Sequence, residues 1–128
     1  MKKRLTIFLM TLLLLLIVAP VSAQVSPADA YKTASKYMLN VAPNPTFGDE
    51  WFIVALARGE YDVPANYYET YYNNLVSEVK KREGILHNRK YTEYSRVILA
   101  LSAIGKDATN VGGYNLVEKL FDFDKVVW

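Results

Sequence analysis

Two apolar stretches decide the fold: WFIVALA at residues 51–57 and VILALSAI at residues 97–104. The first is followed by Arg58 and Gly59 and the second by Gly105, a pattern typical of helix C-termini. A run of seven apolar residues also fits a buried strand, but the alanine and leucine content favours a helix. Because nearly every position is apolar, the sequence predicts two helices that are buried on all sides.

Amphipathic segments surround these two stretches. Ser26 followed by Pro27 is a helix start, and apolar residues recur at three- and four-residue spacing to about Asn40. A second amphipathic helix is expected over residues 65–83, and a short third one over residues 114–121. The expected order is therefore amphipathic, buried, amphipathic, buried, amphipathic.

This alternation predicts an all-α fold built from repeated helical hairpins. The Ala-Leu pair at 55–56 returns at 100–101, and a spacing of 45 residues is typical of helical repeats. Buried helices inside and amphipathic helices outside give a partial α/α toroid. A third buried helix would be centred at about position 146, so we expect the chain to be the N-terminal part of a longer protein.

The N-terminus has the pattern of a secretory signal peptide. Basic residues at 2–4 precede an apolar run over 5–19, and small residues lead to a cleavage site expected after Ala23. The run is shorter than the ~20 residues that span a bilayer, although an uncleaved anchor is the alternative. We therefore expect a secreted or cell-surface protein, with a signal peptide at 1–23 and a toroid segment at 24–128. The protein is expected to contact the membrane only through its transient signal peptide.

Cleavage would change the charge of the chain. The precursor has 15 basic and 13 acidic residues, and three basic residues lie in the signal, which leaves a mature net charge of −1. This balance gives no reason to expect a nucleic-acid partner. The sequence has no cysteine, so neither disulfides nor a lipid-anchoring cysteine is available. Half a toroid would leave apolar helix flanks uncovered, and we expect the isolated mature chain to self-associate.

Three stretches carry a resemblance to a known family: GDEWFIVALARG at 48–59, KYTEYSRVILALSAIGKD at 90–107 and NVGGYNL at 110–116. They resemble exported proteins of Gram-positive bacteria that contain a terpenoid-cyclase or prenyltransferase-like α/α toroid. The resemblance covers most of the mature chain. It implies a secreted or surface-bound toroid, and its relatives often carry a transcobalamin-like module. A small hydrophobic, cobalamin-like or carbohydrate ligand is therefore expected.

The catalytic motifs of that fold are incomplete here. An Asp-x-Asp-Asp acid would need a third acid where Lys125 follows Asp122 and Asp124, and lysine favours ionised aspartate. A zinc site of Asp, Cys and His cannot form without cysteine. We therefore expect a non-catalytic binding or structural module with no cofactor and no metal. The alternative is an enzyme of the same fold, either polysaccharide lyase-like or a degenerate terpene cyclase or prenyltransferase.

The candidate site residues form two groups. His87, Arg89 and Tyr91 are candidate catalytic residues, because toroid lyases use such side chains to neutralise a uronate and abstract its proton. An ordinary loop histidine is the competing interpretation. The candidate ligand-binding residues are aromatic, since they offer flat faces to sugars or cofactors, although core packing explains helical spacing equally well: Trp51, Tyr68, Tyr72 and Tyr94.

Overall fold

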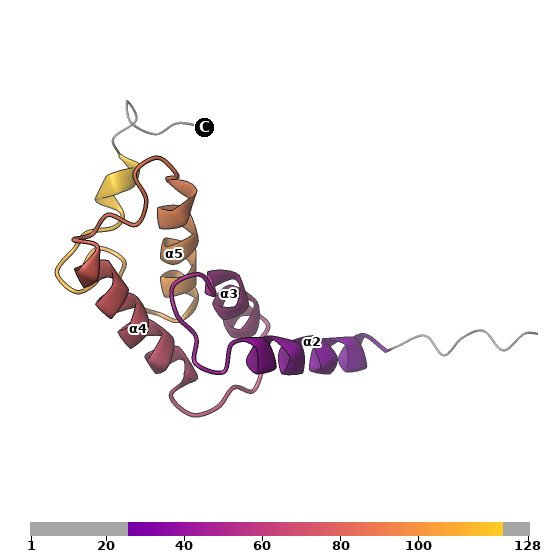
Figure 1. Cartoon of the computed structure of the whole chain (residues 1–128). Helices are drawn as coiled ribbons and strands as arrows, with labels where there is room; N and C mark the ends of the chain where they lie inside the picture. Colours follow the sequence, from indigo (N-terminus) through magenta and orange to yellow (C-terminus); the bar gives the residue numbers. More distant parts are fainter. Residues whose placement is uncertain (1–25, 122–128) are drawn as a thin grey trace, which may run out of the picture. The chain divides into compact units, whose positions relative to one another are not determined.

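Helices dominate the part of the chain that the computed structural model describes, residues 26–121 (Figure 1). In chain order they are α2 Pro27–Val41, α3 Glu50–Arg58, α4 Tyr67–Lys81, α5 Thr92–Ala103 and the 3₁₀ turn η1 Glu118–Leu120. Over these residues the structure contains no β-strand, and an isolated bridge pairs Val111 with Tyr114. The prediction of an all-α chain is confirmed. The expected signal peptide and the Asp122–Lys125 segment lie outside the described residues.

The N-terminus of α2 is capped as its sequence predicts. The Ser26 hydroxyl accepts a hydrogen bond from the Asp29 amide at 3.1 Å and donates one to the Asp29 carboxylate at 2.7 Å. The chain divides within this helix into two units, one ending at Thr33 and the other beginning at Ala34. The following paragraphs concern the second unit. Among the described residues, no helix is long and apolar enough to cross a membrane.

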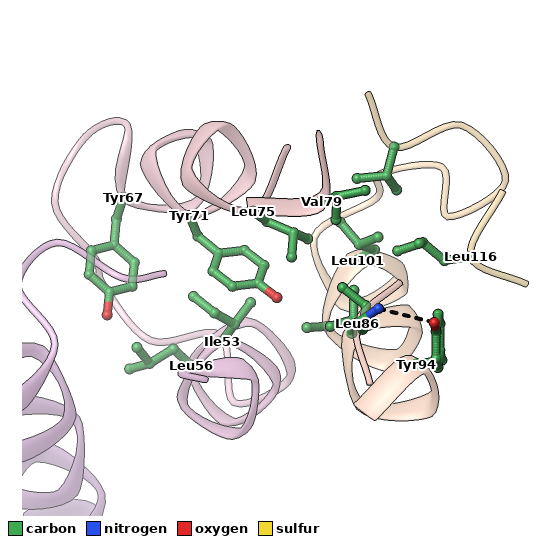
Figure 2. Close-up of a cluster of buried hydrophobic side chains, with 13 residues drawn as sticks. Ile53, Leu56, Tyr67, Tyr71, Leu75, Val79, Leu86, Tyr94, Leu101 and Leu116 are labelled. Carbon is green, nitrogen blue, oxygen red and sulfur yellow. Dashed lines mark hydrogen bonds between the residues drawn. The ribbon is translucent and has the colours of Figure 1, made fainter. Parts of the chain in front are cut away.

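Within the second unit, α3 and α5 pack against each other although α4 separates them in the sequence. Tyr67 and Tyr71 of α4 reach toward Ile53 and Leu56 of α3, and Figure 2 shows their side chains pointing toward one another. Leu101 of α5 belongs to the same buried cluster. Helices α3 and α5 therefore form one layer, and α4 covers it.

The buried cluster draws on α3, α4, α5 and the loops that follow α4 and α5. Its fully enclosed members are mainly aliphatic, with two tyrosines from α4 and one from α5: Ile53, Leu56, Tyr67, Tyr71, Leu75, Val79, Leu86, Tyr94, Val97, Ala100, Leu101, Val111 and Leu116. At roughly 1.5–3 kcal/mol for each large apolar side chain removed from water, this burial is the main stabilising term. The core thus depends on contacts between segments far apart in the sequence.

The expectation that the two apolar helices are buried on all sides is wrong. The side chain of Trp51 in α3 is 59% exposed and that of Leu99 in α5 is 52% exposed. Each helix buries one face only, because α4 and the loops cover the two-helix layer from one side. The large apolar side chains on the opposite face are therefore more than half exposed among the described residues.

The expected fifth helix over 114–121 is also wrong, since only the η1 turn forms there. Gly112 and Gly113 adopt positive φ values of 63° and 97°, which turn the chain so that Val111 pairs with Tyr114. Asn115 then accepts hydrogen bonds from the amides of residues 117 and 118 through its side chain. The local hydrogen bonds of this loop replace the helical ones.

Candidate functional site

The polar loop at 87–91 holds its histidine in a local structural role. His87 Nδ1 accepts hydrogen bonds from the backbone amides of Arg89 at 3.1 Å and Lys90 at 3.0 Å. A neutral imidazole that accepts at Nδ1 carries its proton on Nε2, so no lone pair of the ring faces outward. In this geometry His87 orders the loop, because its Nδ1 lone pair is engaged by two backbone amides.

Tyr91 and Tyr94 lie at the start of α5 beside this loop. Their rings stack with centroids 5.9 Å apart. Tyr94 is buried, and its hydroxyl accepts a hydrogen bond from the Leu86 amide at 3.0 Å and donates one to the Gly84 carbonyl at 3.4 Å; the first is the dashed line in Figure 2. Tyr94 therefore ties the loop to α5, while Tyr91 is half-buried and Arg89 is exposed.

Tyr68 and Tyr72 lie on α4 and are both half-buried. The Tyr68 ring meets that of Tyr67 edge-on, with centroids 5.8 Å apart. Lys106 Nζ lies 4.6 Å from the centre of the Tyr72 ring and 2.7 Å from the Glu69 carboxylate. Tyr72 thus helps to hold the segment after α5 against α4.

Trp51 stands apart from the other aromatic candidates. It lies on the face of α3 opposite the buried Ile53 and Leu56, where Ala55 and Arg58 are also exposed. These three residues follow one another at four- and three-residue spacing and form one stripe of the helix. The structure therefore brings His87, Arg89, Tyr91 and Tyr94 together at the loop and the start of α5, whereas Trp51 lies on α3 and Tyr68 and Tyr72 lie on α4.

The α3/α5 face is the surface formed by the exposed residues of the two layered helices: Trp51, Ala55 and Arg58 from α3, and Leu99 and Ser102 from α5. Val54 and Ile98 are partly buried members of the same two helices. Its two large apolar side chains, Trp51 and Leu99, are each more than half exposed. Sequence reasoning named only Trp51 of this set; the clue to the rest was the stripe that runs from Trp51 to Arg58.

A buried carboxylate fixes the two helices of this face relative to each other. Glu50, at the start of α3, is fully buried and accepts hydrogen bonds from Arg96 Nε at 2.6 Å, from the Gly48 amide at 2.9 Å and from the Tyr71 hydroxyl at 3.4 Å. Arg96 belongs to α5 and also pairs with Glu93. This ion pair, which the sequence did not reveal, joins residues 46 positions apart.

Phe47 lies against the same network. Its ring is within 5.0 Å of the Arg82 guanidinium and 5.9 Å of the Arg96 guanidinium. Arg82 pairs with Glu78 at 2.6 Å and donates a hydrogen bond to the Leu86 carbonyl. The loop before α3, the end of α4 and the start of α5 are therefore linked through one aromatic ring.

The hydroxyls of the two buried tyrosines of α4 donate hydrogen bonds. Burial, the charge of Asp49 and the neighbouring Tyr68 raise the pKa of Tyr67 to about 12, and its hydroxyl donates a hydrogen bond to the Ala42 carbonyl at 2.8 Å. Burial and the Glu50 carboxylate raise the pKa of Tyr71 as well. Both phenols are therefore neutral at physiological pH. Tyr67 holds α4 to the residue that follows α2, and Tyr71 holds α4 to α3.

Metal ligands are not grouped in this chain: among the described residues, no three His, Cys, Asp or Glu side chains are placed to hold an ion. No family model, no curated protein and no solved structure matches the sequence. What the geometry offers is a half-apolar helical face and a polar loop whose histidine is engaged by backbone.

Proposed function

We propose that this chain is the N-terminal part of an exported α/α toroid that acts as a non-catalytic binding module, with the α3/α5 face as its recognition surface. The toroid itself is part of the proposal, and the resemblance of residues 48–59, 90–107 and 110–116 to the exported Gram-positive toroids supports it. So does the packing of α3 beside α5, with α4 on the other side of the layer.

The observation that carries the proposal is the exposure of Trp51 and Leu99 on the side of the layer that α4 does not cover. In a toroid of two concentric helix layers, that side of the inner layer faces the centre. A large aromatic ring there offers a flat apolar surface to a small hydrophobic or cobalamin-like ligand, or to the face of a sugar.

Equilibrium dialysis of the mature chain against cobalamin, and separately against a neutral gluco-oligosaccharide, tests the ligand. We expect retention of one of the two probes by the unchanged chain and its loss in Trp51→Ala. Tyr37→Ala is the matched control, because Tyr37 is 63% exposed but lies on α2. Retention that is equal in all three chains, or no retention at all, contradicts the proposal.

Export is tested by N-terminal sequencing of the protein recovered from the medium or the surface of a Gram-positive host. The proposal predicts a mature chain that begins at Gln24. A protein that stays in the cell with Met1 intact would contradict it.

A further inference from the structure

We propose that the polar loop at 87–91 is a pH-sensitive switch: neutral His87 holds the loop in its ordered form, and protonation of the His87 ring releases it. The inference uses only this loop and the helix ends beside it. It is therefore independent of the toroid, of the ligand and of the α3/α5 face, and it gives the loop histidine a regulatory role.

The order of the turn at 87–90 depends on one side-chain atom. His87 Nδ1 accepts hydrogen bonds from the backbone amides of Arg89 at 3.1 Å and Lys90 at 3.0 Å. Among residues 26–121, no backbone carbonyl accepts a hydrogen bond from any amide of residues 87–90. The imidazole ring therefore takes the place of the carbonyl oxygen that usually closes a turn.

Protonation of the ring removes both of these hydrogen bonds at once. The neutral ring carries its proton on Nε2, so an added proton goes to Nδ1 and turns that acceptor into a donor. The new N–H group would then face two amide N–H groups, which are donors as well. Histidine is the side chain whose ordinary change of charge falls between pH 5 and 8, so mild acid is enough to act on the turn.

The charges around the turn do not compensate for the added proton. Arg89 and Lys90 already place two positive charges in the turn, and among residues 26–121 His87 forms no ion pair. Of the neighbouring carboxylates, that of Glu93 pairs with Arg96 and that of Glu83 is exposed. The other charged or titratable groups of the adjoining elements are Arg82 at the end of α4, Tyr91 and Tyr94 at the start of α5, and Glu118 and Lys119 in η1, which packs on α5.

Release is confined to this turn, because other hydrogen bonds hold the segments on either side of it. Before the turn, the Leu86 amide donates to the Tyr94 hydroxyl, and the Leu86 carbonyl accepts from Arg82. After the turn, the carbonyls of Lys90 and Tyr91 accept from amides at the start of α5. The imidazole takes part in none of these bonds. Acid should therefore free residues 87–90 while α5 and the buried cluster keep their structure.

Backbone order parameters from ¹⁵N relaxation of the labelled protein test the switch. When the pH falls from about 7.5 to about 5, we expect the order parameters of residues 88–90 to fall from about 0.85 to below about 0.6. Those of residues 97–101 in α5 should stay unchanged. Equal order in the turn at the two pH values would overturn the proposal.

His87→Asn is the matched variant, because a side-chain amide oxygen accepts hydrogen bonds but does not gain a proton in this range. Asn115 of this chain already accepts hydrogen bonds from the amides two and three residues further on, the same spacing that His87 uses. We expect the turn of His87→Asn to remain ordered at both pH values. A loss of order in acid as large as that of the unchanged chain would show that His87 is not the sensor.

A second measurement needs only the unchanged chain. The ¹⁵N chemical shifts of the His87 ring report its protonation, and the proposal requires the ring and the order of residues 88–90 to titrate with one midpoint. Two separate midpoints would refute it even if His87→Asn does not order the turn. Neither experiment involves a ligand, so the switch and the proposed function fail separately.

Discussion

Arg96→Met removes the partner of the buried carboxylate at the start of α3. Among residues 26–121, Glu50 would keep two neutral donors, the Gly48 amide and the Tyr71 hydroxyl, and the latter is 3.4 Å away. Methionine preserves much of the apolar stem of the arginine, so the substitution tests the charge more than the packing. The carboxylate of Glu50 has no exposed surface through which water could replace the guanidinium.

The expected cost follows from this burial. Breaking a buried ion pair by removing one partner costs about 3–5 kcal/mol, and the 23% exposure of Arg96 places this pair at the lower end, at about 3 kcal/mol. For a domain of this size that corresponds to a fall in Tm of about 12–24 °C. Glu50→Gln combined with Arg96→Met should recover about 2 kcal/mol, because the amide needs no counter-ion.

Arg82→Met is the matched control. Arg82 also faces the Phe47 ring and also pairs with a glutamate at 2.6 Å, but its side chain is 40% exposed. Its loss should cost about 1 kcal/mol or less. Urea unfolding followed by far-ultraviolet circular dichroism at one protein concentration measures all four chains. If Arg96→Met lowers the free energy of unfolding by no more than Arg82→Met does, the burial of Glu50 does not make this ion pair more stabilising than an exposed one.

Three further predictions concern the buried tyrosine, the turn after α4 and the polar loop. The pKa of Tyr67 is about 12 in the folded chain and near 10.0 for an ordinary tyrosine, so its contribution to the free energy of unfolding should be fully present below about pH 10 and fall as the pH rises toward 12. Urea unfolding at several alkaline pH values should show a smaller fall in the free energy of unfolding for Tyr67→Phe, and equal pH dependence of the two chains would disprove the assignment. Gly84→Ala should lower the free energy of unfolding by about 2–3 kcal/mol in thermal unfolding, because φ is +77° and a Cβ would lie 2.5 Å from the Tyr114 ring. Gly105→Ala is the control, with φ of +70° and open space around it, and should cost about 1 kcal/mol. Equal losses would contradict the role of the ring. His87→Ala should lower the free energy of unfolding by less than about 1 kcal/mol but speed hydrogen exchange at the amides of residues 89 and 90. Incubation with a uronate polymer should yield no unsaturated product with the unchanged chain or with His87→Ala, and a product that depends on His87 would support the lyase interpretation.

Local signals in the sequence were enough to predict most of the helices. Capping at Ser26 and Gly105 and the spacing of apolar residues placed both ends of α2, α3 and α4, and the C-terminal end of α5, within two residues of those observed. These signals act over one turn of chain, and the structure follows them wherever no distant contact competes. The fifth helix failed because two consecutive glycines with positive φ redirect the chain just before it.

The candidate site was less accessible to sequence reasoning. A run in which every residue is apolar has no polar stripe, so it does not indicate which face of α3 or α5 points to solvent. The sequence also gives no sign that Glu50 pairs with Arg96, or that the hydroxyl of Tyr94, a candidate ligand-binding residue, accepts a hydrogen bond from the Leu86 amide. These are consequences of tertiary contacts between segments far apart in the chain.

The pairing of α3 with α5 has a consequence for the order in which the protein can fold. During synthesis, residues 51–57 emerge some 40 residues before the helix that they pack against. Until Arg96 follows, Glu50 has no counter-ion and the apolar run has no layer to join. A contact of such sequence separation must wait for a long loop to close, which slows folding. A nascent chain stalled before α5 should therefore be the form most prone to aggregate and most in need of a chaperone.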